Sequence, residues 1–158
     1  MDLILWRHAE AVDATEGIND LERPLTPKGE RQAKRVADWL NQVLPATTRI
    51  LVSPARRTQQ TAQALERKFK TVDALGPGRE VRDLLAAARW SESREPVLVV
   101  GHQPTLGVTA ALLVGEIEPG AAEPWRIKKA GVWWLRSRDP EEGEASVTVV
   151  TVRSPDML

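Results

Sequence analysis

Cysteine is absent from the 158-residue chain. This absence excludes disulfide bonds, a thiol nucleophile and any metal site built on thiolates. A surplus of either charge is absent too, because 22 Lys and Arg residues balance 22 Asp and Glu residues. No net field draws the protein to polyanions, so we expect neither a nucleic-acid partner nor a membrane partner, and any anion site must be local.

Long apolar runs are also missing. Runs such as residues 97–101 are far too short to span a bilayer. The N-terminus lacks the basic-then-apolar pattern of a signal peptide, so we expect a cytoplasmic protein. Apolar residues make up 42% of the chain and charged residues 28%, which is ordinary globular usage. This length and composition predict a single domain over residues 1–158.

Strand-like and helix-like patterns alternate along the chain. Continuous apolar runs and β-rich segments predict strands over residues 3–6, 49–52, 96–100, 131–135 and 146–152. Apolar residues at helical spacing predict helices over about 27–44, 58–69, 84–90 and 105–114. Thr26 and Pro27 are typical of a helix start, and residues 9–25 and 139–143 have the composition of surface loops.

This alternation predicts an α/β fold, a three-layer α/β/α sandwich. Its central sheet should be mainly parallel, with an antiparallel hairpin at the C-terminus. In such sheets ligands bind outside the carboxyl ends of the strands. Polar residues that directly follow the predicted strands are therefore the first candidates for a functional site.

Two such places hold the only histidines of the chain. His8 follows the first strand together with Arg7, and His102 follows the strand over 96–100. An isolated histidine there is usually a capping or core residue. Beside Arg7, however, a neutral imidazole would face an anion, because a guanidinium group presents paired donors that match phosphate oxygens.

The turn after the strand over 49–52 carries Ser53, Arg56 and Arg57. Free backbone N–H groups at a helix start favour anions. Cations there oppose the helix dipole by roughly 0.3–1 kcal/mol, so two arginines suggest a functional reason. Alternatively, Ser53 caps the helix and both arginines are solvated.

Together these segments resemble the histidine phosphatase superfamily, also called the phosphoglycerate mutase-like family. The family's Arg-His-Gly corresponds to Arg7-His8-Ala9, and its late Gly-His to Gly101-His102. Its Ser-Pro-x-x-Arg-x-x-Gln-Thr motif is matched by Ser53, Pro54, Arg57, Gln60 and Thr61. The short chain and the segment over residues 23–29 are most similar to the small SixA-type phosphohistidine phosphatases.

The resemblance implies a phosphatase in which His8 is the nucleophile and forms a phosphohistidine. Arg7, Arg57 and a cationic His102 would surround the phosphoryl oxygens, and Arg23 and Ser53 would bind substrate. No metal or other cofactor is implied. The implied partner is a phosphohistidine-bearing protein; a phosphatase of small phosphate esters and a non-catalytic phosphate-binding domain are the alternatives.

Three points stay open at this stage. Ala9 stands where the family has glycine, so its backbone must avoid conformations that are costly for a residue with a Cβ atom. The general acid has no clear counterpart, and Asp83, Asp20 and Glu10 are all candidates. Finally, the tryptophans could build a core or an exposed patch; these are Trp90, Trp125, Trp133 and Trp134.

Overall fold

One six-stranded sheet organises the protein. The computed structural model describes residues 1–158 except 116, 119 and 139–145, so the predicted loop over 139–143 lies outside the described residues. The sheet order is β3-β2-β4-β1-β5-β6. The strands are β1 (Asp2–Arg7), β2 (Arg49–Val52), β3 (Lys70–Thr71), β4 (Val97–Gly101), β5 (Val132–Ser137) and β6 (Val147–Arg153). Strands β3, β2, β4 and β1 run parallel, and β5 and β6 run antiparallel, as predicted.

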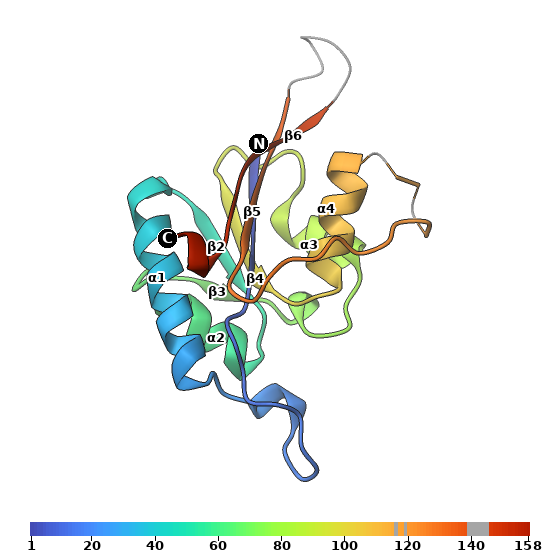
Figure 1. Ribbon diagram of the computed structural model, residues 1–158. Helices are drawn as coiled ribbons and strands as arrows, with labels where there is room; N and C mark the ends of the chain where they lie inside the picture. Colours follow the sequence, from blue (N-terminus) through green and yellow to red (C-terminus); the bar gives the residue numbers. More distant parts are fainter. Residues whose placement is uncertain (116, 119, 139–145) are drawn as a thin grey trace.

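Helices cover both faces of this sheet (Figure 1). They are α1 (Pro27–Val43), α2 (Arg56–Gln63), α3 (Val81–Ala88) and α4 (Thr105–Gly115), and short 3-10 turns span Asp20–Glu22, Asp73–Leu75 and Pro155–Met157. In β1, Ile4 and Trp6 pack in the core beneath α1 and α2, whereas Leu3 and Leu5 pack in the core beneath α3 and α4. Covered strands need apolar residues on both faces, which explains the continuous apolar runs. The predicted three-layer α/β/α sandwich is confirmed.

Two helices differ from their predicted bounds. Helix α2 ends at Gln63 rather than near Phe69, because Glu66 takes a left-handed conformation (φ 55°) and the chain turns into the short edge strand β3, which was not predicted. The apolar spacing continues because Leu65 is still buried beyond the helix. Helix α3 begins and ends earlier than predicted, between a capping box of Glu80 and Asp83 and the left-handed Arg89.

The tryptophans belong to the core rather than to an exposed patch. Trp134 is buried, and its Nε1 donates to Asp2. Trp90, Trp125 and Trp133 are partly buried and pack against the core on the α3 and α4 face. Among the described residues, no helix combines the length and the apolar composition that a membrane crossing needs.

The start of α1 fits tightly against the segment that follows β1. Thr26 Oγ1 accepts from Gly29 N (3.0 Å), and Pro27 is the first helical residue, as predicted. Thr26 N also donates to Glu10 O (3.0 Å). A Cβ atom on Gly29 would lie 2.0 Å from Glu10 O. Only glycine therefore lets this helix lie so close to the segment that carries His8.

The Gly29→Ala variant tests this close approach. Alanine favours helix by about 1 kcal/mol over glycine, but the added methyl group must displace the Glu10 backbone, so we expect a net loss of about 1–3 kcal/mol in the free energy of unfolding. Urea denaturation measures the loss. Lys34→Ala, on the exposed side of the same helix, is the control and should stay within about 0.5 kcal/mol. A Gly29→Ala protein as stable as this control would contradict the packing described.

Candidate active site

The predicted residues meet where three neighbouring strands end. Strand β4 lies between β1 and β2, and its register pairs Gly101 with Arg7 and Val100 with Val52. His8 N donates to Gly101 O (3.2 Å), just beyond this pairing. The helices after β1 and β4, α1 and α4, cover opposite faces of the sheet (Figure 1). This is the kind of strand-order switch at which α/β sheets bind ligands.

A pocket of about 250 Å³ opens at these strand ends. Five of the six predicted site residues line it: Arg7, His8, Arg23, Arg57 and His102. Three further polar residues line it that the sequence did not point to: Asp13, Gln103 and Lys129. Of these three, only Gln103 could have been found from the sequence, because it directly follows His102. Asp13 and Lys129 lie in loops whose path only the fold determines.

His8 is held as a neutral imidazole with one nitrogen free. Its Nδ1 lies 2.7 Å from Ala9 O, and because a carbonyl oxygen only accepts, Nδ1 carries the proton. Burial, reinforced by the charges of Arg57 and Arg7, lowers the pKa of His8 to about 4. Nε2 therefore keeps its lone pair at neutral pH. Ala9 lies outside the left-handed region, so its replacement of glycine adds no backbone strain.

His102 faces His8, with their ring centroids 5.4 Å apart. Burial, with the neighbouring His8 and Arg57, lowers the pKa of His102 to about 3. The expected cationic His102 is therefore wrong for the free protein. A positive charge on this buried ring would be removed from water and would lie beside guanidinium groups, which is too costly.

Ser53 is fully buried beside His102 and does not line the pocket. Ser53 Oγ is 2.7 Å from His102 Nε2 and accepts from Ala55 N (3.3 Å). The Ser53 oxygen accepts from the backbone N–H of Ala55, and its own hydroxyl proton is available to be donated to Nε2 of His102. His102 Nδ1 then carries the ring proton, and among the described residues this buried atom has no acceptor. His102 lines the pocket, and this proton is the one that its ring can donate.

The arginines are fixed by backbone and carboxylate oxygens. Arg57 is buried, donates from Nη1 to Asp20 O (2.8 Å) and pairs through Nη2 with Asp20 Oδ2 (3.2 Å). Arg23 donates to Val12 O (2.6 Å) and to Asp20 Oδ1 (3.0 Å). Arg7 donates to Ile127 O (2.8 Å). Burial lowers the pKa of Arg7 and of Arg57, but guanidinium groups stay charged in proteins.

None of the three predicted acid candidates lines the pocket. Asp83 lies in the first turn of α3 and completes its capping box by accepting from Glu80 N. Glu10 accepts from Thr26 Oγ1 (2.7 Å). Asp20 pairs with two arginines. Burial raises the pKa of this carboxyl group, but hydrogen bonds and charge from Arg23 and Arg57 outweigh burial and hold the pKa below its usual range. Asp13, exposed in the loop after β1, is the carboxylate among the pocket-lining residues.

Metal-ligating side chains do not gather in groups of three or more within the part of the chain that the structure describes. The cations that line the pocket are instead the guanidinium groups of Arg7, Arg23 and Arg57, which come from three separate segments, and the ammonium group of Lys129. They can grip a tetrahedral oxyanion while His8 Nε2 faces its central atom.

Known proteins share both the sequence pattern and the fold. The profile of the histidine phosphatase superfamily (branch 1) matches residues 3–75. Phosphohistidine phosphatase SixA of Escherichia coli (strain K12) is 32% identical over 133 residues, which cover 78% of each chain. The SixA homolog of Haemophilus influenzae is 33% identical over 143 residues, 80% of this chain and 85% of the relative.

Solved structures agree. A protein histidine phosphatase SixA in complex with tungstate superposes with a TM-score of 0.78 at 26% identity, over 99% of this chain and 98% of that one. The resemblance drawn from Arg7-His8, Arg57 and His102 is confirmed by sequence and fold alike. The chain belongs to the histidine phosphatase superfamily and is a phosphatase of SixA-like fold.

Proposed function

We propose that this phosphatase removes the phosphoryl group from a phosphohistidine of a partner protein, through a phosphohistidine intermediate on its own His8. The observation that carries the proposal is the neutral His8 imidazole, with Nδ1 bonded to Ala9 O and Nε2 free, in a pocket lined by arginines. The relatives named phosphohistidine phosphatase SixA support the substrate class. A cytoplasmic location, a single domain and the absence of nucleic-acid and membrane partners stay predictions.

In the proposed reaction His8 Nε2 attacks phosphorus in line. A new P–N bond forms to His8 as the P–N bond of the substrate breaks, and water then attacks the phosphoenzyme and releases phosphate. Arg7, Arg23 and Arg57 neutralise the equatorial oxygens, and His102 Nδ1–H donates to one of them. Ser53 supports this donor by fixing the tautomer of His102.

Few carboxyl groups near the pocket are available to protonate a leaving group, and this favours cleavage of P–N rather than P–O bonds. An alkoxide leaving group needs a proton from the enzyme, whereas an imidazole that is already protonated at its other nitrogen leaves as a neutral ring. Asp20 is paired with arginines and Asp83 caps a helix. Hydrolysis of small phosphate esters is the second candidate, and Asp13 is the carboxyl group that favours it.

A rate comparison tests the substrate class. We expect kcat/KM for a phosphohistidine-bearing protein to exceed that for glycerol phosphate by at least about tenfold, because only the ester depends on an enzyme acid. Phosphate release measures both rates. Equal rates, or a preference for the ester that Asp13→Asn removes, would favour the second candidate instead.

His8→Ala tests the covalent step. The variant should release no phosphate and form no phosphoenzyme, because it lacks the attacking nitrogen. Wild-type protein mixed with a phosphohistidine-bearing protein and quenched in alkali should carry acid-labile phosphate on itself. Transfer to the His8→Ala protein would contradict the mechanism.

Arg57 and Arg56 form a matched pair for testing the arginine cradle. Arg57 is buried in the pocket wall, whereas its neighbour Arg56 is exposed and lines no part of the pocket. We expect Arg57→Ala to lower kcat by about 10²–10³-fold, the usual loss for one preorganised donor, and Arg56→Ala to change it less than twofold. Steady-state kinetics on phosphoramidate measure both. Similar losses in the two variants would contradict a specific role for Arg57.

The protonation of His8 gives a pH prediction. Its pKa is lowered from 6.5 to about 4, so the imidazole stays neutral as the pH falls from 7 to 5 and gains a proton only near pH 4. Imidazole ¹⁵N chemical shifts should show a neutral ring protonated at Nδ1 throughout that range. The chain holds two histidines, so His102→Gln assigns the signals. A titration midpoint near 6.5 would show that His8 is not desolvated as described.

A further inference from the structure

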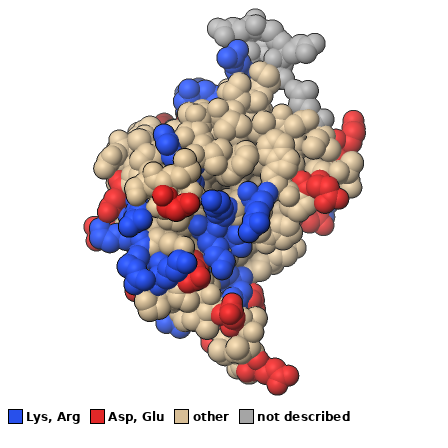
Figure 2. Space-filling model, in the orientation of Figure 1, with Lys and Arg blue, Asp and Glu red and all other residues tan. Residues whose placement is uncertain are grey.

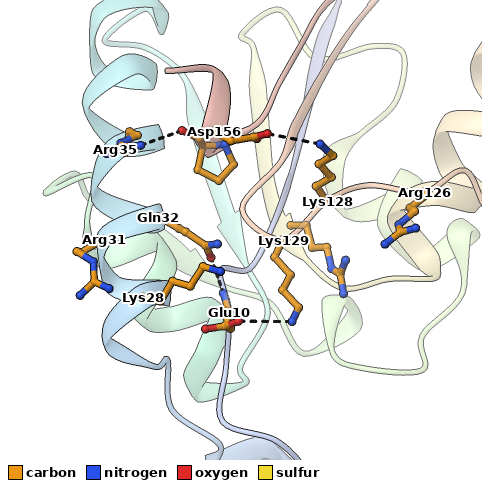
Figure 3. A pocket seen from close by; sticks show the side chains of 11 residues that line it. Glu10, Lys28, Arg31, Gln32, Arg35, Arg126, Lys128, Lys129 and Asp156 are labelled. Atoms are coloured by element: carbon orange, nitrogen blue, oxygen red, sulfur yellow. Dashed lines mark hydrogen bonds and ion pairs between the residues drawn. The ribbon is translucent and has the colours of Figure 1, made fainter.

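A second and larger hollow lies beside the phosphatase pocket. It encloses about 730 Å³ between the first turns of α1, the segment before β5 and the C-terminal turn at Pro155–Met157 (Figure 3). Arg7 of the phosphoryl site lines it too, and we call it the basic groove, after its other cations: Lys28, Arg31, Arg35, Arg126, Lys128 and Lys129. On the molecular surface, Lys and Arg side chains gather over this region (Figure 2). The mechanism above uses none of these six.

The charges of the groove are not balanced locally. Its lining includes two carboxylates, and each faces one lysine: Glu10 lies 3.9 Å from Lys129, and Asp156 lies 3.6 Å from Lys128. Within the described residues, no ion pair is formed by Lys28, Arg31 or Arg126. In a chain with equal numbers of cations and anions, this excess is a local anion-attracting surface.

The cations stand in two facing rows. Lys28, Arg31 and Arg35 are three and four residues apart on α1, so they share one helix face over a length of about 10 Å. Lys128 and Lys129 form the opposite wall, on the other side of the groove from α1 (Figure 3). All five residues are exposed at the rim. Two rows of long, exposed cations match several anions spread along a chain better than a single small anion.

The second wall is joined directly to the catalytic segment. Arg7 Nη1 donates to Ile127 O (2.8 Å), and Ala130 N donates to His8 O (3.0 Å). Lys129 lines both the groove and the pocket of His8. A partner peptide bound in the groove would therefore continue directly into the pocket of His8.

We propose that the basic groove binds an acidic segment of the phosphoprotein substrate, next to its phosphohistidine. The proposal rests on the phosphohistidine phosphatase function proposed above and specifies the partner: a protein with several carboxylates beside the phosphorylated histidine. Such rim charges raise the association rate and select the partner rather than take part in the reaction.

The lining favours a peptide over a nucleic acid. Among the described residues, no aromatic side chain lines the groove, so bases would find no stacking surface on them. Glu10 and Asp156 repel phosphates and carboxylates alike, but a peptide also offers backbone N–H groups from which they can accept, and a phosphodiester backbone has none. An acidic peptide therefore complements both the cations and the two carboxylates.

A pair of phosphopeptides and a pair of variants test the proposal. Each peptide carries one phosphohistidine, flanked by glutamates in one peptide and by glutamines in the other. The K28E/R31E variant reverses two groove charges and leaves the catalytic pocket intact. The control K68E/K70E makes the same charge change at two exposed lysines that do not line the groove.

For wild type and K68E/K70E we expect kcat/KM to be at least about tenfold higher for the glutamate peptide, with an advantage that shrinks in high salt. In K28E/R31E the ratio should fall to about one, while turnover of phosphoramidate stays within twofold of wild type. A ratio of one in wild type, or an unchanged ratio in K28E/R31E, would overturn the groove proposal.

Binding measured without turnover separates the two proposals. A fluorescein-labelled, unphosphorylated glutamate peptide should bind wild type and K68E/K70E, and bind K28E/R31E at least about tenfold more weakly by anisotropy. If wild type hydrolysed neither peptide nor phosphoramidate, the proposed function would fail, and this measurement alone would decide the groove. Tighter binding of an oligothymidylate of equal charge would assign the groove to nucleic acid and overturn the proposal.

Discussion

Parallel pairing of β4 with β1 on one side and β2 on the other brings together the strand ends on which the site is built. Because the three strands run in the same direction, their carboxyl ends lie at one edge of the sheet. Residues far apart in the chain leave that edge together, and the two imidazoles meet with ring centroids 5.4 Å apart. The covering helices diverge to opposite faces there, which leaves room for a ligand.

Burial at this edge sets the chemistry of the imidazoles. Removal from water makes protonation costly, and the nearby guanidinium groups add to that cost, so the pKa values of His8 and His102 fall to about 4 and about 3. Arginine keeps its charge under the same conditions. The pocket therefore holds a neutral imidazole beside permanent cations, a combination that suits attack on a phosphoryl group. Lysine would be a poorer choice there, since burial shifts its pKa readily.

The cations are oriented by partners of two kinds. Backbone oxygens hold Arg7 and Arg23, and Asp20 holds Arg57 through its main chain and its carboxylate. Donors fixed in this way need little reorganisation when an oxyanion binds. The Asp20 side chain is 51% exposed. If an oxyanion took its place on Arg57, the Asp20 carboxylate could therefore turn into water. The hydrogen bond that fixes the Arg7 side chain also ties the second wall of the basic groove to β1, and the bond from Ala130 N to His8 O adds to this link.

Patterns of neighbouring residues determined much of this protein before the fold was known. Continuous apolar runs gave the covered strands, and Thr26-Pro27 gave the start of α1. The histidine and arginine motifs at strand ends gave four residues that line one pocket, and the family resemblance gave a fifth, Arg23. Local pattern could not give the early end of α2, because Leu65 keeps the helical spacing while packing from a turn. Only the tertiary structure decided the support of His102 by Ser53, the anchoring of Arg57 by Asp20 and the facing cation rows of the groove. Apolar runs and helix starts are patterns of residues close in sequence. The contacts named above depend instead on which distant segments the sheet brings together.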